Sequence, residues 1–220
     1  MFTGLIETTG TIVSVTPSAG GTRVMVEAPA RLANRLREGD SVAVNGTCLT
    51  ALAIGADRFS ADLAQETLER TTLGGLDAGA TVNLELPTPA GSPLGGHVVQ
   101  GHVDGVGTLL ALEALHPGHE HSSDWRLGVA ISHELAANVV QQGSITIDGI
   151  SLTVARLHAT KDGAQVEAAV IPHTYKATSL RSLKPGDRVN IETDVLARYA
   201  AQKRPQAEWL TTAYLLANGY

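Results

Sequence analysis

The chain repeats itself, and this duplication restricts its possible folds more than any other feature of the sequence. GLIETTGTIV (residues 4–13) matches GHVDGVGTLL (residues 101–110), and NGTCLT (residues 45–50) returns as DGISLT (residues 148–153). A third pair, residues 66–85 and 173–192, follows in the same order. The separation between the copies grows from 97 to 103 to 107 residues, so the second copy carries small insertions. Three collinear matches indicate a duplicated domain.

Each copy is predicted to consist of short strands. TGTIVSV, TRVMVEA, DSVAVN, CLTALAI and TVNLEL have β-branched residues or alternation, with Gly, Pro and Asp between them. A brief helical pattern at residues 29–36 has a counterpart at residues 132–140. About six strands in roughly a hundred residues suit a small closed Greek-key barrel. We therefore expect an all-β fold of two tandem six-stranded Greek-key barrels with a C-terminal α-helix.

Three segments follow from this plan. Residues 1–96 are expected to form an N-terminal barrel and residues 97–194 a C-terminal barrel, with the Pro- and Gly-rich stretch 86–96 as the link. Residues 195–220 have helix-start signals at Asp194 and Pro205 and a stop at Asn218-Gly219. Such a helix packs either against another subunit, which would make it an oligomerisation segment, or against its own barrel.

Composition excludes several classes of partner. The chain has 220 residues, a net charge of −6 and no basic cluster longer than Lys203-Arg204, so we expect neither nucleic acid nor a membrane as partner. The N-terminus has no basic region followed by a long apolar run, so no secretory signal is predicted. One cysteine cannot form an internal disulfide. These features predict a soluble, cytoplasmic protein.

The repeated phrases predict twin hairpins, because Asn-Gly and Asp-Gly favour type I′ turns. A two-residue turn pairs Ala43 with Cys48 and Ser41 with Thr50. Alternation then gives each hairpin one apolar face for the core and one face of small hydroxyls, with a thiol in the first copy. This polar face is either an ordinary solvated surface or a surface for a flat polar ligand. The absence of long charged side chains from it is compatible with the second reading.

The histidines and the cysteine allow more than one interpretation. His97 and His102 lie five residues apart in an extended segment and point to opposite faces, so a shared metal site is not predicted. The histidine-rich stretch 116–121 is expected to be an exposed loop. Cys48 is either a small buried hydrophobe or a nucleophile, and alternation places it away from the barrel core. We predict no metal site.

Five motifs in order resemble the riboflavin synthase family: MFTGLIE, VNGTCLT, LGGHVVQGHVDGVG, DGISLTV and IPHTYKATSL. The resemblance runs from Met1 to about Tyr199, and WLTTAYLLANGY is similar to the C-terminal helix of that family. It implies a homotrimer without metal or redox cofactor. The implied reaction converts two molecules of 6,7-dimethyl-8-ribityllumazine into riboflavin and 5-amino-6-ribitylaminouracil by transfer of a four-carbon unit. Lumazine synthase is an implied candidate partner.

The resemblance also implies a site between the N-terminal barrel of one subunit and the C-terminal barrel of its neighbour, with one lumazine in each barrel. The residues implied for the N-terminal pocket are Ser41, Cys48, Leu49, Thr50, Asp62, Leu63, Ala64, Gln65, Glu66, Thr67 and Val103, with Gly101 and His102 reaching in. Those implied for the C-terminal pocket are Gly4, Leu5, Ile6, Ser151, Leu152, Thr153, Ile171, Pro172, His173, Thr174, Tyr175 and Lys176.

Two identical substrates must play different parts, so a duplicated site needs a chemical difference between its halves. Here that difference is a thiol at Cys48 against a hydroxyl at Ser151. Our hypotheses are that Cys48 is a nucleophile or proton carrier and that His102 is the acid/base. Ser41, Ser151 and Asp194 would orient and polarise the substrates.

One position departs from the family pattern. Gln142 stands where the family often has a lysine, so a charged contact to the neighbouring subunit's ligand would become a hydrogen bond. This departure affects substrate binding rather than the reaction.

Three rival interpretations share parts of this pattern. A lumazine or fluorescent antenna protein would hold its ligand without turnover, but such proteins tend to lose the catalytic side chains that persist here at Cys48, His97 and His102. A flavin domain of a reductase would need a nucleotide-binding partner domain, for which no chain remains. A purely structural trimer would not explain two matched polar hairpins.

Overall fold

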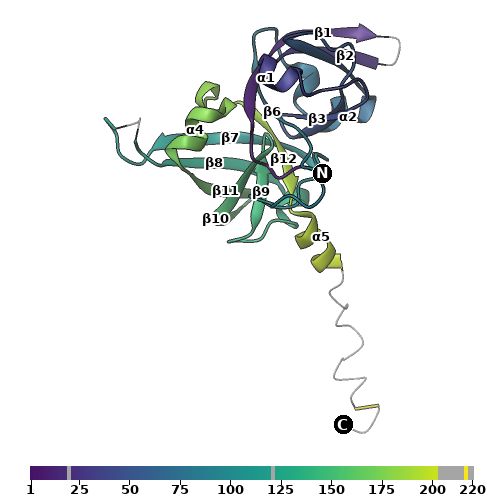
Figure 1. Ribbon diagram of the computed structural model, residues 1–220. Coiled ribbons are helices and arrows are strands. Elements are labelled where there is room, and N and C mark those ends of the chain that lie inside the picture. Colours follow the sequence, from purple (N-terminus) through teal and green to yellow (C-terminus); the bar gives the residue numbers. More distant parts are fainter. Residues whose placement is uncertain (19–20, 120–121, 203–215, 218–220) are drawn as a thin grey trace.

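The computed structural model describes residues 1–18, 21–119, 122–202 and 216–217, and it contains two barrels side by side with a short helix below them (Figure 1). Each barrel has six strands, as the duplication predicts. The expected second helix from Pro205, with the predicted apolar face of Leu210, Ala213 and Tyr214, lies largely outside the described residues.

The first barrel is built by antiparallel pairing in the order β4-β3-β6-β1-β2-β5. Paired backbone hydrogen bonds of 2.7 and 2.8 Å between Leu52 and Ser60 join the two edges of this sheet. The strands are β1 Thr8–Ser18, β2 Gly21–Glu27, β3 Ser41–Val44, β4 Thr47–Thr50, β5 Arg58–Leu63 and β6 Thr81–Glu85.

The second barrel is fully closed, in the order β10-β11-β8-β7-β12-β9. It therefore repeats the first arrangement with longer strands at β10 and β11. Its strands are β7 Gly105–Ala114, β8 Trp125–Ser132, β9 Ser144–Ile147, β10 Ile150–Thr160, β11 Gly163–Val170 and β12 Arg188–Thr193.

The helices also occur in matched pairs. The short helices α1 (Ala30–Ala33) and α3 (His133–Ala136) confirm the two brief helical patterns. Helix α2 (Gln65–Arg70) with the 3-10 turn η1 (Leu73–Gly75) corresponds to α4 (Pro172–Ala177) with η2 (Ser179–Ser182). Helix α5 (Val195–Gln202) follows the last strand, and the Asp194 carboxylate accepts a 2.9 Å hydrogen bond from the Leu196 N–H at its start.

Each barrel has its own apolar core, and the hairpin faces are as alternation predicts. Val42, Val44 and Leu49 lie in the first core. In the second copy Ile145, Ile147, Ile150, Leu152 and Val154 share the other core. The predicted pairing of Ala43 with Cys48 is confirmed.

The two hairpin turns meet where the barrels touch. A Cβ atom added to Gly46 would lie 2.6 Å from the Gly149 backbone nitrogen, so the turns pack backbone against backbone. Two asparagines at equivalent positions tie the barrels together. The Asn83 side-chain amide donates to the Asp148 carbonyl at 3.0 Å, and that of Asn190 donates to the Asn45 carbonyl at 2.9 Å. The molecule thus has an approximate internal two-fold axis between the turns.

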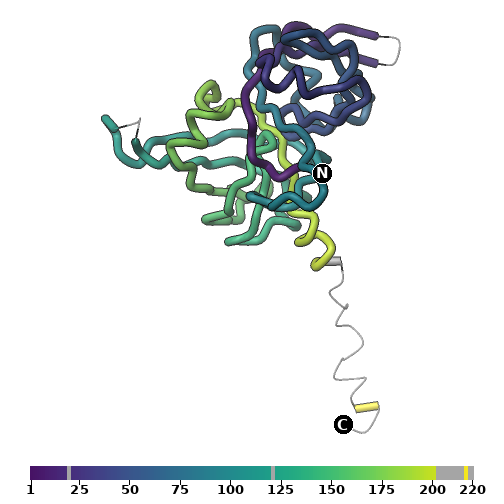
Figure 2. Tube along the Cα trace, viewed as in Figure 1, coloured from purple at the N-terminus to yellow at the C-terminus, as the bar shows by residue number. Residues whose placement is uncertain are grey.

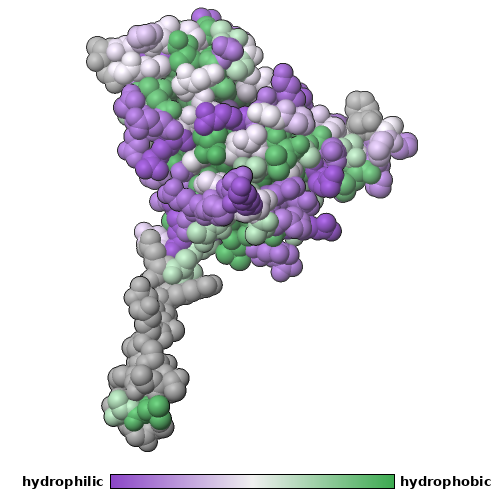
Figure 3. All heavy atoms as spheres, turned by 180° about the vertical axis from the view of Figure 1, so that it is seen from behind, coloured by the Kyte–Doolittle hydropathy of each residue, from purple (hydrophilic) through white to green (hydrophobic). Residues whose placement is uncertain are grey.

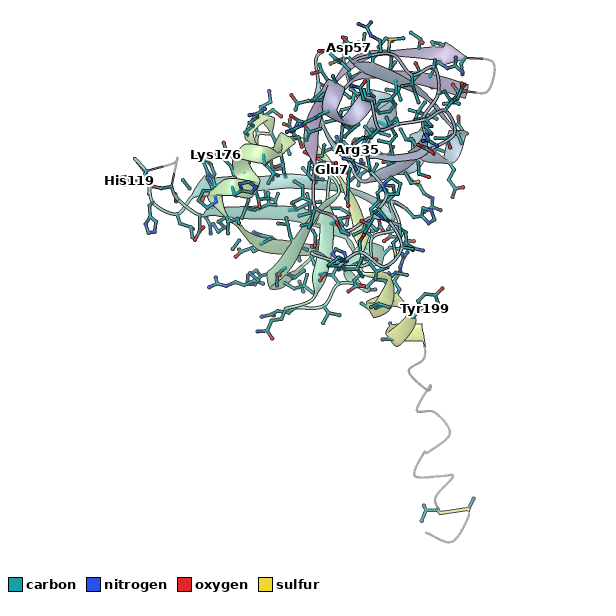
Figure 4. All side chains as sticks on the ribbon, viewed as in Figure 1. Glu7, Arg35, Asp57, His119, Lys176 and Tyr199 are labelled. Atoms are coloured by element: carbon teal, nitrogen blue, oxygen red, sulfur yellow. The ribbon has the colours of Figure 1, made fainter. Side chains whose placement is uncertain are left out.

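The segment that precedes β1 in the first repeat crosses to the second barrel, and the segment that precedes β7 in the second repeat crosses to the first. We call these two the crossing segments. In Figure 2 the purple beginning of the chain leaves the first barrel and runs along the second. Glu7 anchors this segment, because its carboxylate pairs with Arg35 at 2.5 Å and accepts the Leu86 N–H at 3.1 Å; the first pair is visible in Figure 4. A backbone bridge between Phe2 and Val99 joins the two crossing segments.

Candidate functional site

The pocket beside Cys48 lies on the polar face of the first hairpin and has a volume of about 430 Å³. Cys48 is half-buried and packs with Ala43 and with the bridged pair Phe2 and Val99, outside the barrel core. The pocket is lined by Thr47, Cys48, Ala64, Glu66, Thr67, Arg70, Thr71, Gly101, His102, Val103 and Asp104. This position fits neither a core cysteine nor a freely solvated one, and it leaves the thiol beside a ligand-sized space.

The second crossing segment brings His102 to this pocket. The Gly101 carbonyl accepts a 2.8 Å hydrogen bond from the Cys48 N–H, and Gly101 has a positive φ of 78°. A Cβ atom there would lie 2.7 Å from the Cys48 Cβ, so this contact requires glycine. His102 is exposed at the pocket edge, free to approach a bound molecule.

The buried carboxylate of Glu192 holds this crossing in place. It accepts the N–H groups of Gln100 and Gly101 at 2.8 and 3.0 Å. Burial raises the pKa of Glu192 to about 7, although the two N–H donors act in the opposite direction.

The C-terminal barrel repeats this arrangement with Ser151 in the place of Cys48. The carbonyl of Gly4, a residue with a positive φ of 75°, accepts the Ser151 N–H at 2.8 Å. Glu85 accepts the N–H groups of Thr3 and Gly4 at 2.7 and 3.0 Å, and burial raises its pKa. The pocket here, of about 350 Å³, is lined by Ser151, Leu152, Thr153, Ala155, Ala169, Val170, Ile171 and Thr174.

A serine–histidine pair distinguishes this second pocket. His97 Nδ1 lies 2.8 Å from Ser151 Oγ, within hydrogen-bond reach. Its Nε2 is buried without a partner among the described residues. Burial lowers the pKa of His97, partly offset by the charge of Asp194. The imidazole is therefore held mainly neutral and can accept a proton from the serine hydroxyl.

The two pockets therefore differ in both of their reactive positions. In the aligned repeats Leu5 corresponds to His102 and Ser151 corresponds to Cys48. One pocket combines a thiol with an exposed imidazole, and the other combines a hydroxyl with an imidazole within hydrogen-bond distance of it.

Several residues implied by the resemblance do not present their side chains to these pockets. Leu49 and Leu63 belong to the first core and line neither pocket, whereas Leu152, a residue of the second core that is 8% exposed, also lines the Ser151 pocket. Asp62 is exposed and pairs with Arg23 at 2.7 Å. Ser41 lines a separate hollow beside Arg35 and Leu86.

The other implied residues differ in exposure, and of those named below only Thr153 lines a pocket. Tyr175 on α4 stacks on Trp125, with ring centroids 3.7 Å apart. The side chain of Lys176, labelled in Figure 4, is exposed on α4. Thr50, Gln65, Gln142, Thr153 and His173 are also exposed, whereas Ile6 and Pro172 are half-buried.

Sequence reasoning assigned no partner to His97 and did not select the anchors Glu85 and Glu192. His97 lies in the quoted motif LGGHVVQGHVDGVG, and both glutamates end the third pair of repeats, after NL and NI. These positions were visible, but the contacts join residues 54 to 92 positions apart in the chain. In the part of the chain that the structure describes, no group of three or more His, Cys, Asp or Glu residues could hold a metal ion. No helix among those residues is long and apolar enough to cross a bilayer.

Comparison with known proteins places both barrels in one domain family. The lumazine-binding domain family matches residues 3–87 and again residues 100–194. The chain is 42% identical over 200 residues to the riboflavin synthase of Mycobacterium bovis, covering 90% of this chain and 96% of that protein. It is 38% identical to the riboflavin synthase of Actinobacillus pleuropneumoniae, covering 94% and 93%. With that of Bacillus subtilis it shares 36% identity over the full length of both.

Solved structures show the same fold. The crystal structure of LumP complexed with riboflavin matches with a TM-score of 0.77 at 25% identity, covering 88% of this chain and 99% of that one. The complex of LumP with 6,7-dimethyl-8-(1'-D-ribityl) lumazine matches with a TM-score of 0.75 at 24% identity and the same coverage. The expected all-β double barrel is thereby confirmed.

Proposed function

The chain belongs to the riboflavin synthase family, and we propose that it converts two molecules of 6,7-dimethyl-8-ribityllumazine into riboflavin and 5-amino-6-ribitylaminouracil. The four carbons that one lumazine loses are those that the other gains, so the atoms balance without a third reactant. We place this activity in the cytoplasm, in line with the single cysteine.

The observation that carries the proposal is the pairing of two similar pockets with different reactive groups. Each pocket has a crossing glycine bonded to the residue that bears the thiol or hydroxyl, at 2.8 Å in both cases. A protein that only stored a ligand would need no such chemical difference. A dismutation needs one, because one lumazine donates carbon and the other accepts it.

In the N-terminal barrel we assign Cys48 and His102 to addition and proton transfer. The thiol lies at the pocket wall, where it can add to an electron-poor lumazine ring. His102 is exposed at the same pocket, so its imidazole can exchange protons with the substrate or with water. General acid–base catalysis by a positioned histidine typically contributes about 10²- to 10⁴-fold to a rate.

In the C-terminal barrel we assign Ser151 and His97 to deprotonation. The C7 methyl group of lumazine is acidic, and loss of a proton from it leaves an anion that polar groups must stabilise. Ser151 would take this proton as it passes its own hydroxyl proton to the neutral imidazole of His97, 2.8 Å away. Asp194, at the start of α5, supports the positive charge that His97 would acquire.

The assembly that we propose is a homotrimer in which two chains complete each site. The pockets of one chain share no lining residue, which supports a site formed by pockets of different chains. Hydrophobic patches interrupt the polar surface of both barrels (Figure 3). On α5, Leu196 and Tyr199 are 62% and 61% exposed, so this helix is the proposed contact with a neighbouring chain. Lumazine synthase, which would supply the substrate, remains a candidate partner.

The test is incubation of the purified protein with 6,7-dimethyl-8-ribityllumazine alone. We expect riboflavin and 5-amino-6-ribitylaminouracil in equal amounts, with two lumazines consumed for each riboflavin. A stable fluorescent complex without riboflavin would contradict the proposal and support an antenna protein of the same fold. Sedimentation of the active protein as a monomer would contradict the shared site.

A further inference from the structure

A third cavity lies between the barrels, on the internal two-fold axis, and has a volume of about 600 Å³. It shares no lining residue with the pockets of Cys48 and Ser151. Its walls come in equivalent pairs from the two repeats: Asn45 and Asp148, Thr72 and Ser179, Gly75 and Ser182, Leu76 and Leu183, Gly79 and Gly186, Ala80 and Asp187, Thr81 and Arg188.

The frame of this cavity is rigid because both repeats hydrogen-bond across the axis. The Asn190 side chain accepts the Thr72 N–H at 2.8 Å, and the Asn83 side chain accepts the Ser179 N–H at 2.7 Å. Both asparagines are 1% exposed. These bonds, with the touching glycines of the two turns, keep the cavity walls apart and fixed.

Two polar groups that line this cavity are buried and incompletely bonded. Asp148 is 2% exposed; one of its carboxylate oxygens accepts the Asn190 N–H at 2.8 Å, and no hydrogen bond within the described chain reaches the other. Ser179 is 1% exposed, and its hydroxyl has no partner within those residues. Buried polar groups normally find partners, so an incompletely bonded pair in a cavity indicates a ligand or ordered water.

The lining indicates the chemistry of such a ligand. Only Asp148, Asp187 and Arg188 among the lining residues are charged, which leaves a net charge of −1 when Asp148 is ionised. Asp148 lies deep and Arg188 is exposed, so the carboxylate is the charge that a bound molecule would meet. Leu76 and Leu183 add two half-buried apolar walls. A flat apolar body with N–H donors satisfies both features.

We propose that this inter-barrel cavity is a second ligand site, which binds a small amidine- or amino-substituted aromatic molecule through Asp148. The N–H donors of the ligand would bond the free carboxylate oxygen, and its ring would lie between the two leucines. The site is separate from the lumazine pockets and does not depend on the reaction proposed for them.

Ligand affinity at this site should depend on pH, because the Asp148 carboxyl is buried. Burial raises the pKa of Asp148 to about 7, and Asp187 and Arg188 are the charged side chains that share the cavity with it. A cationic amidine binds the ionised carboxylate. Its affinity therefore rises roughly tenfold between pH 6 and pH 8, the range over which Asp148 loses its proton.

The experiment uses benzamidine as the amidine probe and 2-aminopyrimidine as the neutral one, with the whole protein, by isothermal titration and amide NMR. We expect one saturable site per chain for benzamidine, with shifts of the Gly149 and Ser179 amides. Asp148→Asn should weaken binding at least tenfold. This variant should fold, because Asn45 occupies the equivalent turn and accepts the equivalent N–H, from Asn83, at 2.7 Å.

Asp187→Asn is the matched control, since it removes the same charge from a less buried part of the cavity wall, and it should bind benzamidine within about twofold of the wild type. Riboflavin formation should be unchanged in Asp148→Asn. The proposal is overturned if neither probe binds saturably at about 10 mM. Equal affinity in Asp148→Asn, or displacement of the probe by 6,7-dimethyl-8-ribityllumazine, would overturn it as well.

Discussion

The two lumazine pockets have the same frame and different reactive groups. In each pocket a buried glutamate, Glu85 (4% exposed) or Glu192 (2% exposed), accepts backbone N–H groups of a crossing segment. The carbonyl of a glycine in that segment, Gly4 or Gly101, accepts the N–H of Ser151 or Cys48. The side chains that this frame presents then diverge: Cys48 and His102 in one pocket, Ser151 and His97 in the other. The duplication preserved the parts that position a ligand and changed the parts that would react with it.

This difference explains how one chain can treat two identical molecules differently. The frame supplies equal shape, so each pocket accepts the same substrate. The reactive groups supply unequal chemistry, because a thiol with an exposed imidazole and a hydroxyl with a buried neutral imidazole favour different steps.

Replacement of the exposed imidazole should have the largest effect. We expect His102→Gln to lower kcat about 10²- to 10⁴-fold and to alter the pH–rate profile, because acid–base catalysis is lost. His158→Gln is the control, since His158 is an exposed histidine on β10 away from both pockets. Measurement of riboflavin formation across pH checks this, and an unchanged profile would remove His102 as the proton carrier.

Ionisation of Asp148 should make the protein less stable as pH rises. Its folded pKa, about 7, lies above the unfolded value of 3.8, so its stabilising contribution is present at low pH and is lost as pH rises through 7. We expect about 3 kcal/mol less unfolding free energy from this group at pH 8 than at pH 5. Urea unfolding at both pH values should show a smaller difference in Asp148→Asn. Glu192, whose pKa is also raised to about 7, leaves a residual trend in the same direction.

Replacement of the crossing glycines by alanine should have a smaller effect, on stability. Gly101→Ala and Gly4→Ala should each cost about 2 kcal/mol or more, because both combine a positive φ with a clash against the opposite barrel. Gly39→Ala, with a φ of 91° and no atom within 4 Å of an added Cβ, measures the backbone strain alone. Thermal unfolding should therefore rank Gly39→Ala as the mildest. Equal losses in all three variants would mean that the crossings do not pack as described.

Disruption of the stack between Tyr175 and Trp125 should have the smallest effect. Tyr175→Leu restores the residue type of the other repeat, where Leu68 stands, and removes the stack on Trp125. We expect a loss of about 1 kcal/mol in unfolding free energy. Tyr199→Leu, at a tyrosine 61% exposed in the single chain, is the control and should change the stability of isolated chains by less than about 0.5 kcal/mol.

Local features were predictable from the sequence, and long-range contacts were not. The pairing of Ala43 with Cys48 followed from an Asn-Gly turn, and the core face followed from alternation, because both rules act within a few residues. The repeats also predicted two barrels. The contact of His97 with Ser151 could not be predicted, since it joins residues 54 positions apart through a crossing of the chain. The same is true of the cavity between the barrels, because its walls come from both repeats.

The most direct test of the account is complementation between two inactive variants. One carries Cys48→Ala and His102→Gln, the other Ser151→Ala and His97→Gln, and the two are co-expressed with different tags and purified through both. If each site joins the N-terminal pocket of one chain to the C-terminal pocket of the next, every mixed trimer has one intact site of three and should regain up to about a third of wild-type riboflavin synthesis. Activity that stays at the level of the separate variants would contradict the claim that two unequal pockets from different chains form one site.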